Sequence, residues 1–434
     1  MAVDLVLKDG IIIVNDRESI QSVAIDSGKI EGFYKHGEEP ESKKIIDCRG
    51  LYILPGLIDM HVHLRDLGQF EKEDYESGTM AAAAGGITTV VDMPNSKPPV
   101  LTRKILDQKI TSASAKRYVN VGFYAGIGKI FDSSMVPDIL GLKVYPHSPL
   151  LYGVQFDGKQ MEKCIKLANK HNLPLLFHPD SSTKDDEPKT REEFFLIHSC
   201  ESEVNSLQAF LDAKVEYEAR LHVCHVSCAA TVRLILEHRA EQTLTAEITP
   251  HHMLLSGENF PHDDGVAKML PPLRSPYDTQ MLAQALCMKC AIDCVASDHA
   301  PHTNSQKIAP FLEAASGIPG LETTLPLMLT EVFEGRISWI DFLRCCCSGP
   351  AMILGISNKG ILAEGYDADI VLVRRQEWYI SGADFQSKAK LTPFEGRRVL
   401  AKPVTTIVDG QIVYHEGIFM VGPGIVGKVP LRKT

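Results

Sequence analysis

The sequence predicts an α/β protein: a (β/α)8 TIM barrel joined to a small β-sandwich domain that the N- and C-terminal segments form together. Two observations support this prediction. Apolar β-type runs alternate with helical patterns through the middle of the chain, and short strand patterns occupy both ends. A length of 434 residues accommodates a large barrel and an accessory domain. The predicted limits are 1–54 and 353–434 for the two parts of the sandwich, and 55–352 for the barrel.

The terminal segments carry short apolar runs that alternate with turn-forming residues such as Asp-Gly and Ser-Gly. Because both ends have this β-rich character, we expect them to pair into one small domain. The runs are Leu5–Leu7, Ile11–Val14 and Ser22–Ile25 at the N-terminal end, and Ala368–Val373, Thr405–Val408 and Gln411–Tyr414 at the C-terminal end.

Eight apolar runs lie between these ends, and eight alternations favour a closed barrel over an open doubly wound sheet. The runs are Gly56–Leu64, Ile87–Pro94, Asn120–Ile127, Leu140–Tyr145, Leu173–His178, Leu221–Val226, Leu244–Thr249 and Ala291–Asp298. Helical spacing of apolar residues predicts helices over Glu73–Ala84, Met161–His171, Glu203–Leu211 and Asp278–Met288. A charged loop is predicted at Ser181–Arg191, beside the barrel mouth.

The composition is that of an ordinary globular protein, with 44% hydrophobic and 23% charged residues. A formal charge of −10 argues against a nucleic-acid or anionic-membrane partner, because both need a basic surface. The N-terminus lacks the pattern of a signal peptide, and eleven cysteines without a framework spacing are typical of reduced thiols. We therefore expect a cytoplasmic protein with a small-molecule substrate. A homo-oligomer is compatible with the sequence, which leaves the oligomeric state open.

Polar residues that close the predicted strands indicate a metal site. Catalytic groups of such barrels lie at the C-terminal ends of the strands. A single histidine there is more often a hydrogen-bonded core residue, but several on one rim favour metal ligation. The strand ends supply His61, His63, His178, His225 and Asp298.

Lys143 lies inside an apolar run, where burial disfavours a charged ammonium group. Two interpretations stay open from the residue alone: a salt bridge, or reaction with CO2 to a carbamate that bridges two cations. Cys224 and Glu247 lie on adjacent predicted strands nearby. They could bind a further ion, although packing and hydrogen bonding is the favoured interpretation.

Several motifs resemble those of the dihydroorotases of the long, amidohydrolase-superfamily type, and the resemblance covers essentially the whole chain. It implies a zinc-dependent cyclic amidohydrolase that interconverts (S)-dihydroorotate and N-carbamoyl-L-aspartate in de novo pyrimidine biosynthesis. The motifs are His61-Val62-His63-Leu64-Arg65, Asp92-Met93-Pro94-Asn95, Thr249-Pro250-His251-His252, Pro271-Pro272-Leu273-Arg274 and Asp298-His299-Ala300-Pro301-His302.

The resemblance also implies a role for each matching residue. His61, His63 and Asp298 would hold one Zn²⁺, His178 and His225 a second, and carboxylated Lys143 would bridge the two ions of each chain. Arg65, Asn95 and His302 would bind the substrate carboxylate. We hypothesise that a hydroxide bridging the ions attacks the ring amide, and that Asp298 carries the proton to the leaving nitrogen.

Four positions depart from the usual pattern of the family. Leu67 replaces proline, Pro179-Asp180 follow His178 where alanine or cysteine and glutamate are common, and Leu270 precedes the double proline where asparagine is frequent. Leu270 and the 181–191 loop bear on substrate choice. The alternatives are a hydantoinase, dihydropyrimidinase or allantoinase, which need no acidic-group pocket, and a non-catalytic scaffold. The physiological metal, the net direction of the reaction and the partner enzymes of the pathway stay open.

Overall fold

The computed structural model describes residues 2–150, 156–182, 187–214, 217–239, 243–261, 263–288 and 291–432. Residues 183–186 of the predicted charged loop lie outside this part of the chain. Within the described ranges, no helix combines the length and the apolar character that a membrane span requires.

A parallel sheet of eight strands forms the middle of the described chain, and each of the eight predicted runs contains one of its strands. Neighbours in the sequence are neighbours in the sheet. The ring is closed by a parallel bridge between Val62 and His299, where the His63 amide donates to the His299 carbonyl at 2.8 Å. The strands are β6 (Leu57–Val62), β7 (Ile87–Asp92), β8 (Asn120–Ala125), β9 (Gly141–Val144), β10 (Leu175–Phe177), β11 (Leu221–Val223), β12 (Leu244–Ile248) and β13 (Cys294–Val295).

Helices follow most of these strands, and all four helices predicted from sequence are present with ends shifted by a few residues. Helix α1, for example, begins after Asp74, whose carboxylate accepts from the Ser77 amide at 2.9 Å and caps the first turn. The α helices are α1 (Tyr75–Ala84), α2 (Arg103–Lys116), α3 (Gly158–Lys170), α4 (Arg191–Ile197), α5 (Cys200–Lys214), α6 (Ala229–Glu237), α7 (Pro250–Leu254), α8 (Pro276–Cys287), α9 (Asn304–Ile308), α10 (Thr324–Phe333), α11 (Trp339–Leu343) and α12 (Gly349–Leu354). Short 3₁₀ segments are η1 (Ser133–Asp138), η2 (Gly257–Asn259) and η4 (Gly382–Asp384), and η3 (Arg344–Ser348) is a π-helical turn.

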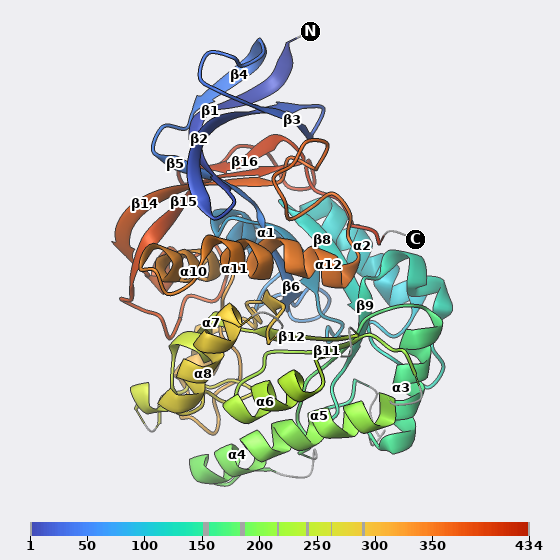
Figure 1. The fold of residues 1–434 in the computed structure, drawn as a ribbon. Coiled ribbons are helices and arrows are strands. Elements are labelled where there is room, and N and C mark those ends of the chain that lie inside the picture. Colours follow the sequence, from blue (N-terminus) through green and yellow to red (C-terminus); the bar gives the residue numbers. More distant parts are fainter. Residues whose placement is uncertain are drawn as a thin grey trace.

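Strands from both ends of the chain form a second sheet, which lies beside the barrel at the top of Figure 1. In the described chain it contains nine strands, and β5 pairs antiparallel with β14, so the segment before the barrel joins the segment after it. The predicted sheet domain from both termini is therefore confirmed, while its exact limits stay a prediction. The strands are β1 (Val3–Val14), β2 (Arg17–Asp26), β3 (Lys29–Tyr34), β4 (Ser42–Asp47), β5 (Leu51–Pro55), β14 (Ile370–Tyr379), β15 (Arg398–Val408), β16 (Gln411–His415) and β17 (Ile418–Phe419).

An apolar plug fills the barrel below the strand ends. Met60, Tyr124 and Leu176 belong to one buried cluster, and the Tyr124 hydroxyl donates to the Met60 carbonyl at 2.9 Å. Side chains alternate along a strand, so Phe177 faces outward and stacks on Phe210 of α5 with ring centroids 4.0 Å apart. The barrel is therefore packed rather than hollow, and polar side chains at the strand ends rest on this plug.

Candidate metal centre

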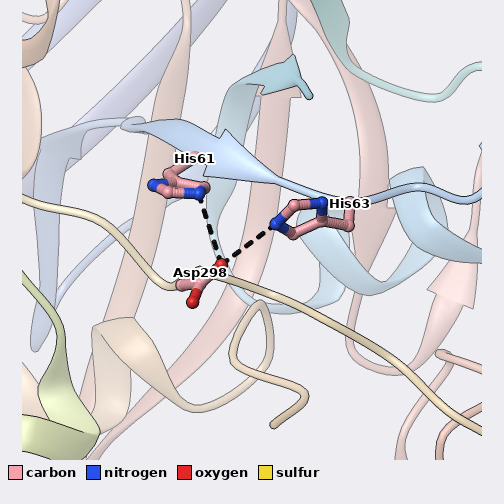
Figure 2. A group of neighbouring side chains, drawn as sticks. All are labelled: His61, His63 and Asp298. Atoms are coloured by element: carbon pink, nitrogen blue, oxygen red, sulfur yellow. Dashed lines mark hydrogen bonds and ion pairs between the residues drawn. The ribbon is translucent and has the colours of Figure 1, made fainter. Parts of the chain in front are cut away.

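The paired histidines at the end of the first barrel strand meet Asp298, which follows the eighth (Figure 2). Both Nε2 atoms point to the same carboxylate oxygen of Asp298, at 3.3 Å from His61 and 3.2 Å from His63. Burial raises the pKa of Asp298, but the two rings outweigh it and hold that pKa below its usual range. Asp298 has a φ of +45°, a strained conformation for a residue other than glycine. The chain accepts this local strain where it turns the carboxylate toward the two imidazoles.

His178 and His225, at the ends of β10 and β11, form a second pair. His178 Nδ1 lies 2.9 Å from His225 Nε2, and burial lowers the pKa of both rings well below the usual value, so both are neutral. The opposite nitrogens, His178 Nε2 and His225 Nδ1, have no hydrogen-bond partner within the described chain. The ring centroids of His61 and His225 are 5.3 Å apart. Two neutral imidazoles facing each other, next to a histidine and carboxylate set, are donors suited to Zn²⁺.

Lys143 lies on β9, next to β10 in the sheet, and is completely buried. Its Nζ donates to Cys224 Sγ at 2.7 Å and lies 5.0 Å from the Tyr145 ring centroid. Among the described residues, it has no carboxylate within ion-pair distance. The salt-bridge interpretation of this lysine therefore finds no partner in the described chain.

Glu247 on β12 connects three histidines from two other strands, β6 and β11. Its buried carboxylate pairs with His61 Nδ1, lies 3.1 Å from His222 Nε2 and accepts from the His225 backbone amide at 3.1 Å. A carboxylate on the far nitrogen of a ligating histidine fixes its tautomer and orientation. These hydrogen bonds agree with the interpretation favoured for Glu247 from sequence, although the donor atoms of His61, Cys224 and Glu247 also lie within 4.8 Å of one another.

A cavity of about 270 Å³ opens above these groups, and the three residues predicted to bind a carboxylate line it. The Asn95 side-chain oxygen lies 2.8 Å from His63 Nδ1, which leaves its amide nitrogen as a donor. Arg65 Nη2 is 3.4 Å from His302 Nε2, and Arg65 Nε and His302 Nδ1 are buried without a partner in the described chain. Burial lowers the pKa of His302 to about 3. Leu270, the departure noted above, also lines the cavity.

Sequence reasoning missed three polar residues near the site: Tyr145, His147 and His222. Tyr145 lies two residues after Lys143, so the period of a strand places both on the inner face, and its buried hydroxyl has no partner among the described residues. His222 lies two residues before Cys224, so the same strand period places both side chains on the inner face. His147 follows the strand in a loop, where no periodicity applies, and it lines the cavity.

The comparisons with known proteins agree with this geometry. The amidohydrolase family model matches residues 52–413. A dihydroorotase of Methanosphaera stadtmanae is 35% identical over 95% of this chain and 97% of its own length. Dihydroorotases of Lactobacillus gasseri, 34% identical over 95% and 99%, and Methanothermobacter thermautotrophicus, 33% identical over 94% of each chain, are also similar.

Solved structures share the whole fold. The L-hydantoinase (dihydropyrimidinase) of Arthrobacter aurescens superimposes with a TM-score of 0.91 at 25% identity, covering 99% of this chain and 100% of its own. The dihydropyrimidinase of Brevibacillus agri has a TM-score of 0.87 at 24% identity, covering 98% and 97%, and is similar in fold alone. Sequence identity is higher to the dihydroorotases than to these two enzymes. The chain therefore belongs to the amidohydrolase family and, within it, to the dihydroorotase group.

Proposed function

We propose that this protein is a dihydroorotase that interconverts (S)-dihydroorotate and N-carbamoyl-L-aspartate. The observation that carries the proposal is the placement of Arg65, Asn95 and His302 around one cavity, directly above the buried histidine and aspartate cluster. A hydantoinase or dihydropyrimidinase acts on rings that need no carboxylate pocket. Arg65 gives this cavity a cation with a planar fork, which suits a carboxylate.

We further propose that the centre holds two Zn²⁺ ions, with His61, His63 and Asp298 as ligands of one and His178 and His225 as ligands of the other. When bound, such ions lower the pKa of water and polarise the amide carbonyl. The donor types and the neutral His178 and His225 rings support this assignment.

Carboxylation of Lys143 is part of the same proposal. The amine nitrogen would bond to the carbon of CO2 and release one proton, which gives an anionic carbamate between the two groups of ligands. Its support is the complete burial of Lys143 without a carboxylate partner in the described chain. A carbamate would supply the missing negative charge.

The remaining steps belong to the residues of the chain. Arg65, Asn95 and His302 bind the carboxylate and thereby hold the ring with its amide over the cluster. Asp298 lies 3.2–3.3 Å from both paired histidines. It takes up the proton that is released when the oxygen of the attacking water bonds to the amide carbon. It then delivers that proton to the departing ring nitrogen. In the cyclisation direction the same carboxylate accepts the proton from the attacking nitrogen.

Assays of the purified protein on dihydroorotate, dihydrouracil, hydantoin and allantoin, combined with metal analysis, test the proposal. We expect turnover of dihydroorotate and about two zinc ions per chain. Replacing Asp298 by alanine should abolish turnover in both directions. Turnover of only the neutral rings would remove the dihydroorotase assignment, and substantial activity of the Asp298→Ala protein would exclude the proton-transfer role.

We also propose a cytoplasmic location. The ten cysteines among the described residues are free thiols, and eight of them are buried. Free buried thiols are typical of proteins from reducing compartments. Fractionation of the source cells with an antibody against the protein tests this location, and recovery in a membrane or secreted fraction would contradict it.

A further inference from the structure

His147 is a polar residue at the cavity that the proposed mechanism does not use. It follows β9, four residues after Lys143, and lines the same cavity as Arg65 and His302. Its ring packs on His178 with centroids 4.4 Å apart and an interplanar angle of 39°. Its Nδ1 atom is buried and has no hydrogen-bond partner in the described chain. A buried polar atom without a partner costs free energy, and a bound ligand can satisfy it.

The neighbouring histidine, His198, is hydrogen-bonded within the protein through its Nδ1 atom. His198 Nδ1 lies 2.6 Å from Asp180, whose other oxygen accepts from the Ser202 hydroxyl at 2.7 Å. His147 is 6.4 Å from His198, measured between ring centroids, and takes no hydrogen bond from this network. Within the described chain, Nδ1 of His198 therefore has a hydrogen-bond partner, whereas Nδ1 of His147 has none.

The order of the strands places His147 opposite the carboxylate pocket. Arg65 follows β6 and His302 follows β13, and these first and last strands meet where the ring closes. His147 follows β9 and packs on the histidine after β10, the fourth and fifth strands of the eight. A ligand whose carboxylate is held by Arg65 therefore extends its remaining atoms toward His147.

We infer that His147 is a substrate-binding residue, whose Nδ1–H donates a hydrogen bond to an oxygen in the ureide portion of the ligand. The inference rests on the proposed function, because that function orients the ligand across the cavity. Dihydroorotate and its open form both carry ureide and acyl oxygens on the side away from the α-carboxylate. The contact is therefore available to the substrate and to the product, and it selects for a hydrogen-bond acceptor at that end.

Two substitutions separate this role from packing. His147→Phe keeps a planar ring against His178 but removes the donor, and His147→Asn places an amide nitrogen near the position of Nδ1. His171→Phe is the matched control, because His171 also packs on an aromatic ring, Phe131 at 5.6 Å, and does not line the cavity. The readouts are KM and kcat for dihydroorotate, the Kd of N-carbamoyl-aspartate by calorimetry, and zinc per chain.

We expect His147→Phe to weaken N-carbamoyl-aspartate binding roughly three- to tenfold, the effect of one neutral hydrogen bond. His147→Asn should bind about twofold or more tighter than His147→Phe, and zinc content should match the wild type in all three variants. Binding by His147→Phe as tight as wild type would overturn the inference. So would a loss of zinc in that variant, because His147 would then act by supporting His178.

An incorrect dihydroorotase assignment would give different results from an incorrect role of His147. If the wild-type protein turns over dihydrouracil but neither turns over dihydroorotate nor binds N-carbamoyl-aspartate, the dihydroorotase assignment falls. The same variants are then titrated with N-carbamoyl-β-alanine, which has the same ureide and lacks the α-carboxylate. Weaker binding by His147→Phe would still support the contact, and equal binding would overturn it.

Discussion

Replacing Arg65 by methionine should convert an enzyme selective for an acidic ring into one that no longer distinguishes it from a neutral ring. Arg65 is the cation of the carboxylate pocket, and its Nε is buried without a partner in the described chain. Burial lowers the pKa of the guanidinium, yet arginine stays charged at every working pH. Methionine keeps much of the side-chain length and apolar stem while it removes the charge and the donors.

The size of the effect follows from this environment. A hydrogen bond to a charged group contributes roughly 1.5–3 kcal/mol, and a buried fork with unpaired donors belongs at the upper end of that range. Since 1.4 kcal/mol corresponds to about tenfold, kcat/KM for dihydroorotate should fall by roughly 10- to 150-fold. Arg65→Lys keeps the charge but loses the planar fork, so its decrease should be smaller.

Two ligand pairs provide the assay. Steady-state kinetics compare dihydroorotate with dihydrouracil, and calorimetry compares N-carbamoyl-aspartate with N-carbamoyl-β-alanine, which differs only by the α-carboxylate. We expect Arg65→Met to weaken the member of each pair that carries the α-carboxylate and to leave the member without it within about threefold, because only the former has the carboxylate that Arg65 is proposed to bind.

Equal losses for the ligands with and without the α-carboxylate would contradict this role, since Arg65 would then support the architecture of the site rather than bind a carboxylate. An unchanged preference for the ligands with the α-carboxylate would also contradict it. Zinc analysis of the variant accompanies both measurements, so that loss of metal is recognised as a separate cause.

Three further predictions concern the surroundings of the site. Glu247→Gln should weaken zinc binding roughly 10- to 100-fold in a chelator competition, because the carboxylate that orients His61 and His222 is lost; unchanged affinity would contradict this. Phe210→Ala should lower the free energy of unfolding by about 3–5 kcal/mol in urea titrations, since it removes the ring stacked on β10, and a loss below about 1 kcal/mol would contradict the packing. Lys307 is buried and donates to two backbone carbonyls, and burial followed by the charge of Lys268 lowers its pKa from 10.5 to about 7. Between about pH 7 and 10.5 the unfolded chain binds this proton and the folded chain does not, so this lysine contributes stability that rises with pH by up to about 1.4 kcal/mol per unit. Lys307→Met should therefore lose stability relative to wild type as pH rises from 6.5 to 8.5, and a pH-independent difference would contradict the assignment.

The positions of the barrel strands could be predicted from sequence because each parallel strand is buried on both faces and is therefore a continuous apolar run. The lengths of the strands could not be predicted from sequence. The last run, Ala291–Asp298, contains only two residues of regular strand, β13 (Cys294–Val295), before the chain turns. Positive φ at His225 and Asp298, +34° and +45°, marks where side chains leave the regular ladder to face the cavity.

The ligand positions were predictable because they close apolar runs, whereas their supporting residues required the fold. The contact of Glu247 with His61 joins β12 to β6 across the barrel interior, which no local pattern encodes. His147 lies in a loop, and its importance comes from an atom left without a partner. Local periodicity therefore predicts which strand carries a polar group, while the partner of that group depends on long-range packing.

The pairing of β5 with β14 has a consequence for synthesis of the chain. β5 leaves the ribosome early, but its antiparallel neighbour is translated only after the entire barrel. Until then one edge of β5 exposes unpaired backbone groups, a surface that recruits other extended chains. Nascent chains stalled before residue 370 should accordingly bind chaperones or aggregate. A C-terminal truncation should disrupt the terminal sheet before it disrupts the barrel.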